Sequence, residues 1–513
     1  MKCNAVNSFV LLSFTIAVIF LGLTPFHTIE ELISFVIRLF CQRHRVTMHR
    51  FKKKLDIPQT YREGIFHITE TFRRHNYECY MVGGSVRDLL LGRDVHDFDF
   101  ATNARPEQVM RLFRRVAPTG IKHGTVTLLI EDHTFEVTTY RNDGRYMDGR
   151  RPESVTFSDS LEQDVLRRDF TMNGLAYDVQ TEEVIDYVGG IEDIERGLIR
   201  TIGSAVDRLS EDGLRSYRAC RLSSKLGFDI DKAALSAITA TLDIARMVSA
   251  ERVRDELIKL LETDKPSVGF EYMRITGLLD VFLPELADCY EVSQNKFHVY
   301  DIYYHCVYSC DAAPKDDTII RLSALLHDIG KLPTRKEGEG GDFVFYNHEV
   351  IGTRMAKKIM RRLKFSNEEI ERATNLIYNH MFHYTDEWTD GAVRRFMRKV
   401  GVENLEDLFE VRKADRKGNG SREGLPVPIL QLIARIQKII EAENAITVRD
   451  LNINGYIIMD EFKIQPGPAI GRILNELLEI VLDHPDLNTK EYLIEKAREI
   501  YPLISADRSP KGI

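Results

Sequence analysis

The stretch Met81–Pro106, MVGGSVRDLLLGRDVHDFDFATNARP, has a paired glycine at one end and two aspartates at the other. Asp97 and Asp99 alternate with Phe98 and Phe100, so in a strand the two carboxylates lie on one face and the two rings on the other. Neighbouring carboxylates repel each other unless a cation lies between them, and Mg²⁺ favours carboxylate and phosphate oxygens. The alternation therefore predicts a strand that carries a Mg²⁺ site.

The paired glycine precedes a helical pattern. Gly83, Gly84 and Ser85 stand between the strand-like run CYMV and the helical run VRDLLLG, where a turn can present backbone N–H groups to a phosphate. Glu136, on the strand-like run FEVTTYR, is available as a third carboxylate. Phosphate and metal groups in one unit suit nucleotidyl transfer. On their own, however, the aspartate pair and the glycines also suit a surface strand and a tight bend.

Composition sets limits on the function. The chain has 513 residues, enough for about three or four domains. The hydrophobic share of 43%, the charged share of 29% and the mean hydropathy of -0.24 are typical of a soluble globular protein. A net charge of -8 excludes a uniformly basic coat for nucleic acid, although local basic clusters can still bind phosphates. The seven scattered cysteines contain no Cys-x-x-Cys pair, which favours a reducing, cytoplasmic location.

The first 47 residues form an apolar N-terminal extension, with an almost wholly apolar run at Phe9–Leu23. Three interpretations stay open: an over-extended reading frame with the true start at Met48, a single membrane anchor, or a cleaved signal. A membrane association is not expected unless this segment is translated and retained.

Patterns along the chain indicate an α+β protein. Residues 55–200 mix helical and strand patterns, including a hairpin in TVTLLIEDHTFEVTTY around Glu131–His133. After Arg200 the strand patterns nearly vanish and long amphipathic segments dominate. GEGGDFVFYN is predicted to be a glycine-rich loop within this helical part.

Further motifs follow the aspartate pair in order along the chain: RRDFTMN (167–173), DYVGGIEDI (186–194), EDGLRSYRACR (211–221) and AERVRDEL (250–257). Together they resemble the class II nucleotidyltransferases, which comprise the tRNA CCA-adding enzymes and the bacterial poly(A) polymerases. The resemblance is close over Leu55–Thr263. NINGYIIMDEFKIQPGPAIGRIL (452–474) resembles the tail of the family, although a plain structural turn explains its Gly-Pro step equally well.

The resemblance implies roles for particular residues. Asp97, Asp99 and Glu136 are expected to be catalytic, with Asp97 and Asp99 holding Mg²⁺. The residues expected to bind the triphosphate and ribose are Gly83, Gly84, Ser85, Arg87, Arg168, Asp169 and Asn173. In the helix of EDGLRSYRACR, Asp212 and Arg215 are expected to pair with the edge of the incoming base, with Arg218 and Arg221 on the same side.

Elementary chemistry supports the base-reading assignment. A carboxylate accepts from an exocyclic amine and a guanidinium donates to ring acceptors, so Asp212 and Arg215 together can imitate the pairing edge of a base. Cytosine and adenine both carry that amine. The spacing of Arg215, Arg218 and Arg221 also fits a solvent-facing basic stripe.

A second constellation lies in the helical part. LSALLHDIGKLP (322–333) contains His327 and Asp328 and, with His305 and Asp415, resembles the HD metal-dependent phosphohydrolases. His348 is a further candidate ligand, and Lys331 is expected near a phosphate. Imidazoles and carboxylates together favour a divalent transition metal, namely Ni²⁺, Mn²⁺, Co²⁺ or Zn²⁺.

The resemblance implies that this second site hydrolyses phosphoesters. In some CCA-adding enzymes such a domain acts on 2′,3′-cyclic or terminal phosphates. The alternative is a degenerate HD domain that is kept as a helical scaffold. No sequence feature places His298 or His380 at a metal, so we assign both to the core or the surface.

These observations predict template-independent addition of C, C and A to tRNA 3′ ends from CTP and ATP, with an accessory phosphohydrolase activity. The expected partners are tRNA, ATP and CTP, with no obligate protein partner evident. Within the same class, a poly(A) polymerase or an enzyme restricted to CC or A addition has the same motifs. From another class, the chain could be an HD phosphohydrolase or an RNA-binding scaffold with an inert head.

The expected architecture is an α/β nucleotidyltransferase head followed by an all-α neck and body, an HD domain and a helical tail. Its expected parts are the apolar extension 1–47, the head 55–200, the nucleotide-selecting neck 201–265, the body with the HD domain 266–417, and an RNA-binding tail 418–513.

Overall fold

The computed structural model describes residues 48–143, 155–295, 298–338, 342–420, 424–442 and 447–506. The chain divides into two compact units, which we treat separately. The first extends to Arg141 and includes 157–168 and 172–191, and the second comprises 142–156, 169–171 and everything from Glu192 onward. The N-terminal extension 1–47 lies outside the described residues. Within the described ranges, no helix is both long and apolar enough to cross a membrane.

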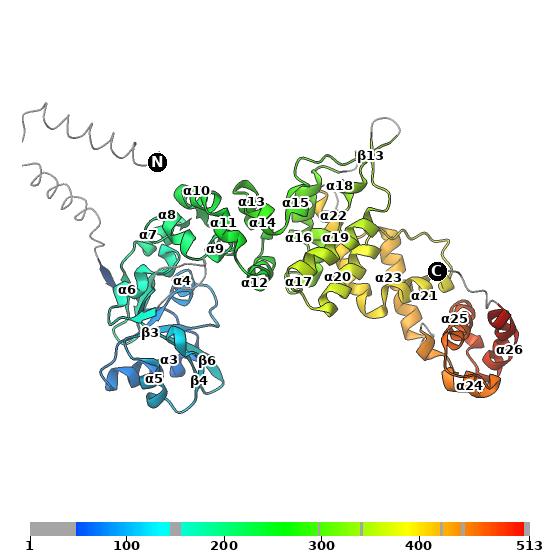
Figure 1. The fold of residues 1–513 in the computed structure, drawn as a ribbon, viewed down its shortest axis with the longest axis horizontal. Helices are drawn as coiled ribbons and strands as arrows, with labels where there is room; N and C mark the ends of the chain where they lie inside the picture. The colour runs from blue at the N-terminus through cyan, green and yellow to red at the C-terminus, as the bar shows by residue number, and fades with distance from the viewer. Residues whose placement is uncertain are drawn as a thin grey trace, which may run out of the picture. The chain divides into compact units, whose positions relative to one another are not determined.

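The first unit is built on an eight-stranded sheet with the order β1-β10-β9-β2-β3-β6-β5-β4. Its strands are β1 (His49–Lys52), β2 (Cys79–Val82), β3 (Asp99–Thr102), β4 (Val116–Gly120), β5 (Thr125–Ile130), β6 (His133–Thr139), β9 (Leu175–Asp178) and β10 (Glu183–Asp186). Its helices are α3 (Gln59–Arg74), α4 (Gly84–Leu90), α5 (Pro106–Leu112) and α6 (Leu161–Leu166), seen in Figure 1 around the sheet. Two further short strands, β7 (Arg141–Asp143) and β8 (Val155–Phe157), flank residues 144–154.

Buried aromatic rings form the core against which this sheet packs. Phe98, Phe100 and Phe135 are buried, and the rings of Phe100 and Phe135 lie 6.2 Å apart. The predicted hairpin is confirmed, because β5 and β6 pair in antiparallel register across a turn at Glu131, which adopts a positive φ of 54°. The pair β3–β6 is parallel, whereas the other strand pairs of the sheet among the described residues are antiparallel.

The second unit is mainly helical. The helices are α8 (Ala205–Glu211), α9 (Leu214–Leu226), α10 (Lys232–Ala240), α11 (Leu242–Arg246), α12 (Ala250–Leu261), α13 (Pro266–Ile275), α14 (Leu278–Phe282), α15 (Pro284–Ala287), α16 (Ile302–Ala312), α17 (Thr318–Leu326), α18 (Lys331–Thr334), α19 (His348–Arg362), α20 (Asn367–Asn379), α21 (Asp390–Val400), α22 (Leu405–Gly418), α23 (Val427–Glu441), α24 (Gly455–Phe462), α25 (Pro468–Asp483) and α26 (Lys490–Ala506). The helix α7 (Gly190–Arg196) joins the two units.

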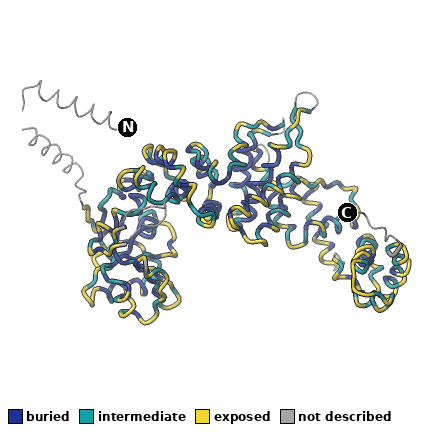
Figure 2. Tube along the Cα trace, in the orientation of Figure 1, coloured by how far each residue is buried: buried dark blue, intermediate teal, exposed yellow. Residues whose placement is uncertain are grey.

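Helices far apart in sequence enclose the middle of this unit. α16 packs against α17 and α22, and α19 packs against α20. Figure 2 shows that the buried positions of these helices lie on their inner sides. The predicted glycine-rich loop, GEGGDFVFYN (338–347), follows β13 (Lys336–Glu337) and includes β14 (Phe343–Val344), which pairs with β13 in antiparallel register. The α+β class expected from the sequence is confirmed.

Candidate active site and metal cluster

Two carboxylates lie opposite each other on neighbouring strands of the first unit, and a third, Asp97, precedes one of these strands. Asp99 opens β3 and is half-buried, and Asp97 precedes it and is exposed, whereas Phe98 and Phe100 are buried. The parallel register of β3 and β6 places Asp99 opposite Glu136, whose side chain is exposed. The alternation predicted from the sequence is therefore present. Carboxylate oxygens on one accessible strand edge are the donor set that Mg²⁺ prefers.

The glycine turn lies against this carboxylate pair. Gly83 has a φ of 80°, a conformation that side chains rarely adopt. A Cβ atom at Gly83 would lie 3.1 Å from Nη1 of Arg168 and 4.0 Å from Oδ2 of Asp99. Glycine thus keeps open the space between a guanidinium and a carboxylate. The Gly83 N–H donates to the Leu175 carbonyl at 3.2 Å, so donors toward a phosphate come from Gly84 and Ser85 in the first turn of α4.

Arg168 is oriented by an acid that sequence reasoning missed. Asp164 is fully buried, and it accepts from Arg168 Nη2 at 3.2 Å and from Arg167 Nε at 2.9 Å. Burial alone would raise the pKa of Asp164, but Arg168 and Arg167 outweigh it and lower that pKa below its usual range. The signal was available in the sequence, because Asp164 stands three and four residues before the arginine pair on a helical pattern.

Arg87 and Asn173, both expected at the nucleotide, bind each other. Arg87 is only 3% exposed, it donates to Asp88 Oδ1 at 2.8 Å, and its Nη1 donates to the Asn173 side chain. Its guanidinium lies 3.4 Å from the position of a Cβ at Gly84. The Ser85 hydroxyl donates to the Val82 carbonyl at 3.1 Å. These bonds tie the glycine turn to the RRDFTMN segment.

In the second unit, Asp212 accepts two hydrogen bonds from an arginine that sequence reasoning did not single out. Arg252 on α12 donates to both Asp212 oxygens, at 3.1 and 2.7 Å. Asp212 also accepts from the Leu214 N–H at 3.0 Å at the start of α9. Arg215 pairs with Glu211 and donates to the Arg208 carbonyl at 2.8 Å. The two expected base-reading side chains are thus each held by a separate partner.

Arg218 and Arg221 also have acidic partners. Arg218 donates to Asp169 Oδ2 at 3.0 Å, and that carboxylate, with burial opposing it and Glu256 adding to it, raises the Arg218 pKa. Arg221 donates to Glu256 at 2.6 Å. The alternative of a solvent-facing basic stripe is therefore wrong. Asp169, expected at the nucleotide, here joins RRDFTMN to α9.

A cluster of imidazoles and carboxylates lies between α16, α17, α19 and α22. The Nε2 atoms of His305 and His327 are 3.0 Å apart, and they lie 3.1 and 3.2 Å from Asp328 Oδ2. Asp415 Oδ1 lies 3.3 Å from His305 Nε2. The four residues predicted as ligands therefore converge, and they are almost wholly buried.

Two further histidines face the other oxygen of Asp328. The Nε2 atoms of His348 and His380 lie 3.4 and 3.7 Å from Asp328 Oδ1. Among the described residues, both Nε2 atoms and that oxygen are buried without a hydrogen-bond partner. Buried polar atoms that converge without partners fit a cation. His380 is buried, as expected of a core residue, but the expectation that it lies away from the metal candidates was wrong, because it faces the cluster.

His298 also lies at the cluster, so its assignment away from the metal candidates was wrong as well. Its ring groups with His305 and Asp328 as candidate ligands. Lys331 contacts His298 Nε2 at 3.3 Å, Gln294 Oε1 at 2.7 Å and Asp328 Oδ2 at 2.6 Å. Neither histidine belongs to a dipeptide or a spacing that marks a ligand, so only the packing of distant segments brings them here.

The electrostatics of the cluster favour positive charge. Burial alone would raise the pKa values of Asp328 and Asp415. The charges of His327 and Lys331 instead hold the pKa of Asp328 well below its usual range, and hydrogen bonds from His305 and His327 do the same for Asp415. Burial alone would lower the pKa of His327, yet Asp328 and Asp415 raise it to about 10. A divalent transition metal supplies the same compensation to this nitrogen and oxygen donor set.

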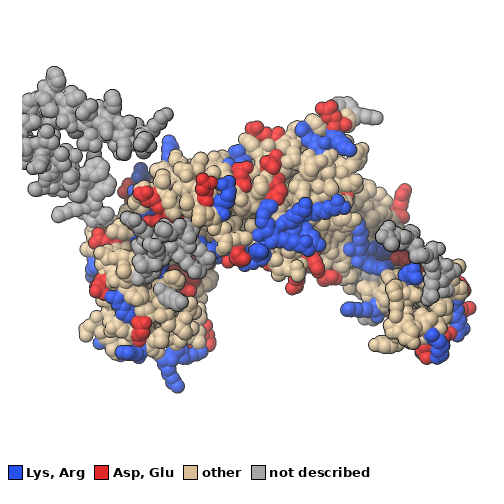
Figure 3. All heavy atoms as spheres, in the orientation of Figure 1, with Lys and Arg blue, Asp and Glu red and all other residues tan. Residues whose placement is uncertain are grey.

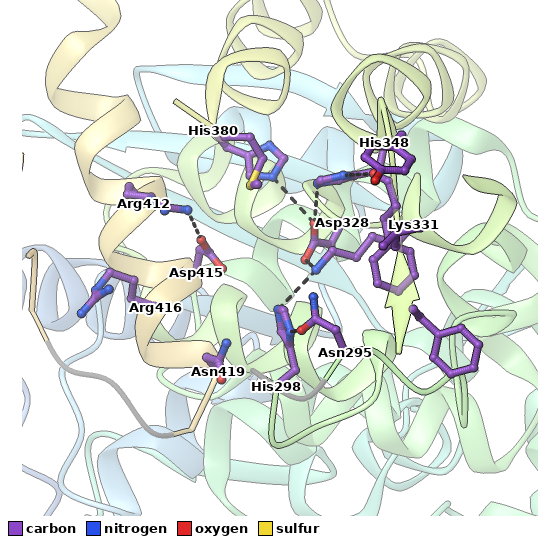
Figure 4. Close-up of a pocket in the computed structure, with 15 residues that line it drawn as sticks. Asn295, His298, Asp328, Lys331, His348, His380, Arg412, Asp415, Arg416 and Asn419 are labelled. Carbon is purple, nitrogen blue, oxygen red and sulfur yellow. Dashed lines mark hydrogen bonds and ion pairs between the residues drawn. The ribbon is translucent and has the colours of Figure 1, made fainter. Parts of the chain in front are cut away.

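The cluster opens into a cavity of about 410 Å³. As Figure 4 shows, Arg412, Arg416 and Asn419 lie together on one side of it. The segment Phe343–Tyr346 also lines the cavity. Arg412 donates to Asp415 at 2.8 Å. The cavity therefore joins a metal-binding floor to walls that carry arginines and aromatic rings.

Comparison with known families agrees with this geometry. Residues 79–200 match the profile of the poly A polymerase head domain, residues 227–290 that of the RNA and SrmB-binding site of polymerase A, and residues 344–497 that of tRNA nucleotidyltransferase domain 2. The first match covers most of the expected head, the second spans the expected neck and body, and the third spans the expected HD domain and tail.

Individual relatives give the same result. A CCA-adding enzyme of Geobacillus kaustophilus is 49% identical over 220 residues, which are 43% of this chain and 54% of the relative. The chain thus spans about half the length of this relative and of others matched at similar identity. A CCA-adding enzyme of Streptococcus sanguinis is 30% identical over 427 residues, covering 83% of this chain and 94% of the relative.

A solved structure extends the likeness to the fold. The Bacillus stearothermophilus CCA-adding enzyme in complex with CTP has a TM-score of 0.66 at 26% identity, covering 88% of this chain and all of that one. A Thermotoga maritima CCA-adding enzyme complexed with tRNA, at 17% identity and a TM-score of 0.51, shares the fold. From the carboxylate and glycine geometry together with the near full-length match, we conclude that the chain belongs to the family of CCA-adding enzymes.

Proposed function

We propose that this protein adds C, C and A to the 3′ ends of tRNA from CTP and ATP, without a template. The observation that carries the proposal is the register of Asp99 with Glu136 beside the turn where Gly83 faces Arg168. Membership of the family, and the CTP bound in the Bacillus stearothermophilus relative, support the choice of reaction and substrate.

The head residues have distinct roles in the proposed reaction. Asp97, Asp99 and Glu136 would hold Mg²⁺, which when bound activates the terminal ribose hydroxyl and neutralises the phosphates. Arg168 binds the negative charge of the triphosphate, and Asp164 holds that guanidinium in place. Gly83 keeps the approach open because it has no side chain.

The neck residues choose the base. Asp212 accepts from the exocyclic amine of cytosine or adenine, and Arg215 donates to a ring acceptor of the same base. Uracil has a carbonyl where cytosine has that amine, so its oxygen would face the Asp212 carboxylate and be rejected. Arg252 fixes the Asp212 carboxylate through two bonds.

Defined tRNA ends test this function. Transcripts that end at the discriminator base, at C or at CC are incubated with CTP and ATP, separately and together. We expect stepwise completion to CCA, and an Asp97→Asn variant should lose at least about 1,000-fold in incorporation because its metal site is disrupted. Asp94→Asn, an exposed aspartate of the same segment, is the matched control. Long A tails on any RNA would instead establish a poly(A) polymerase.

We further propose a second activity, metal-dependent hydrolysis of phosphoesters at the histidine cluster. The observation that favours it is the convergence of four buried imidazoles on the two oxygens of Asp328. Asp415 completes the donor set. These residues would hold a divalent transition metal, which when bound polarises a phosphoester and lowers the pKa of water.

Metal titration tests the second activity. Protein stripped by a chelator is supplied with Ni²⁺, Mn²⁺, Co²⁺, Zn²⁺ or Mg²⁺ and assayed with p-nitrophenyl phosphate. We expect hydrolysis with at least one transition metal and little with Mg²⁺ alone. Absence of hydrolysis with every ion would leave the cluster as a structural scaffold, without affecting the proposal for the head.

The proposed partners are tRNA, CTP and ATP, with the tail 418–513 contributing to RNA binding. These substrates also make the cytoplasm the proposed location.

A further inference from the structure

Residues of α21, of α23 and of the turn before α21 line a hollow of about 760 Å³ that neither proposed activity uses. The hollow shares no lining residue with the cavity of the histidine cluster. Its charged lining residues are Asp386, Asp390, Arg394, Arg435 and Lys438. Figure 3 shows Lys and Arg side chains close together where Figure 1 labels α21 and α23. We call this feature the α21–α23 hollow.

Arg394 is a buried cation at this hollow. The residue is only 6% exposed. Its Nη1 donates to the Leu482 carbonyl at 2.8 Å, whereas its Nε is buried without a hydrogen-bond partner among the described residues. The guanidinium also forms no ion pair with any residue that the structure describes. A buried guanidinium without an anion is unfavourable, because burial removes the water that would otherwise solvate its charge.

The two carboxylates whose charges act on Arg394 are each bound by another arginine. Asp390 accepts from Arg435 Nε at 2.5 Å, and Asp483 accepts from Arg395 Nη2 at 2.6 Å. Burial lowers the pKa of Arg394 even though Asp390 and Asp483 oppose that change, and Arg435 adds to the decrease. The charge of Arg394 therefore still lacks a counterion, which an external anion can supply.

Helix α23 adds further donors on the side that lines the hollow. Gln431, Arg435 and Lys438 follow one another at spacings of four and three residues, which place them on one face of the helix. Lys438 is exposed and forms no ion pair with a described residue. Three lining cations against two lining acids, Asp386 and Asp390, leave one positive charge in excess.

We propose that the α21–α23 hollow binds a phosphate group through Arg394, Lys438 and the side-chain amide of Gln431. Guanidinium, ammonium and amide donors from two helices suit an anion with several oxygens around one centre, whereas a carboxylate offers only two oxygens in a plane. Lys438 and Gln431 are exposed, so a phosphate on a large molecule can reach the hollow as well as a free one. The ligand class is a phosphate, either free in solution or in the backbone of tRNA. The site depends on neither proposed activity.

Thermal unfolding of the full chain in inorganic phosphate, against chloride at equal ionic strength, tests the free anion. A ligand that binds only the folded state raises Tm, so the Tm of the parent should rise with phosphate. Lys438→Gln, a change at an exposed position, should raise the phosphate Kd obtained from this dependence about fivefold. The head is the same in the parent and the variant, so the difference between them reports on the hollow.

Arg394→Met tests the buried cation in the same assay. It should be as stable as the parent in chloride, because an apolar chain replaces a buried charge that lacks a counterion. It should also lose much of the increase in Tm that phosphate gives the parent.

Binding of a tRNA transcript that lacks CCA, measured by fluorescence anisotropy over a range of salt concentrations, tests the backbone. If the phosphate belongs to tRNA, Lys438→Gln should raise Kd about fivefold at low salt and reduce the slope of log Kd against log salt by about 1. Lys413→Gln, which removes an exposed lysine of α22 that pairs with Glu410, is the matched control and should behave like the parent in both assays.

The two assays also identify the source of the phosphate. A change confined to the phosphate titration assigns a free anion, and a change confined to tRNA binding assigns the backbone. Unchanged affinity of Lys438→Gln for both ligands, or an effect no larger than that of Lys413→Gln, would overturn the proposal. An Arg394→Met variant that loses the same Tm in phosphate and in chloride would also overturn it, because the arginine would then have a purely structural role.

Discussion

Several candidate site residues of this protein are oriented by a hydrogen-bonded neighbour. Arg168 is aimed by Asp164, which is fully buried, and Arg87 is tied to Asn173. Residue types and spacing identified Asp97, Asp99 and the four central residues of the histidine cluster, because carboxylate and imidazole patterns are local. Asp164 was missed although its spacing to Arg167 and Arg168 is a local signal. Arg252, His298 and His380 were missed because each owes its place to a neighbour that no local pattern encodes.

Asp164→Asn should destabilise the protein in a pH-dependent way. The folded-state pKa of Asp164 lies below its usual 3.8, so its carboxylate stabilises the fold fully above about pH 5 and loses that effect as pH falls through the folded pKa. Because the variant leaves two arginines without their buried partner, we expect a loss of about 3 kcal/mol in the free energy of unfolding at pH 7.

Urea unfolding of the parent and of Asp164→Asn at pH 7, 5, 4 and 3 measures this effect. The difference in the free energy of unfolding between parent and variant should stay constant from pH 7 to 5 and shrink below about pH 4. Asp243→Asn removes an exposed aspartate that pairs with Arg246 and should show little gap at any pH. A gap that persists unchanged at pH 3 would contradict the assignment.

At the scale of elements, the sequence predicted which segments are strands and helices better than it predicted how they meet. The hairpin β5–β6 and the strand that carries Asp99 followed from alternation and turn residues. The parallel pairing of β3 with β6, which places Asp99 opposite Glu136, joins segments separated by a helix and a further strand pair. Likewise α12 meets α9 through Arg252 and Glu256, and neither contact has a local signature.

Arg252→Lys should relax base selection. A lysine supplies one point charge in place of the planar pair of donors, so the Asp212 carboxylate would lose its fixed orientation. We expect the preference for CTP over UTP, as a ratio of kcat/KM values on a tRNA lacking CCA, to fall about tenfold.

Arg246→Lys, at an exposed ion pair on α11, is the control for this change. An unchanged ratio of kcat/KM values for CTP and UTP in Arg252→Lys would show that the hydrogen bonds from Arg252 to Asp212 do not govern base selection.

At the scale of the whole molecule, the chain carries two separate sets of candidate metal ligands. The head presents carboxylates on an accessible strand edge, which suits Mg²⁺ and a nucleotide, whereas the helical unit buries imidazoles around Asp328, which suits a transition metal. The two donor sets differ in chemistry, so their activities should be separable by single substitutions.

His380→Ala should lower the transition metal bound per chain and the hydrolysis of p-nitrophenyl phosphate, while incorporation of CMP and AMP stays unchanged. The reason is that His380 Nε2 faces Asp328 Oδ1 without another partner in the described part of the chain. Metal content by atomic emission is the direct measurement. His383→Ala, an exposed histidine three residues away, is the matched control, and equal metal content in both variants would exclude His380 as a ligand.

The sequence by itself determined the α+β class, the order of the motifs, the carboxylate strand and the HD ligands, because each depends on periodicity or on residue types close in the chain. Only the tertiary structure decided the register of Asp99 with Glu136, the grip of Arg252 on Asp212 and the entry of His298 and His380 into the cluster. The physical reason is that these relations depend on packing between segments tens of residues apart, which hydrophobic periodicity does not encode.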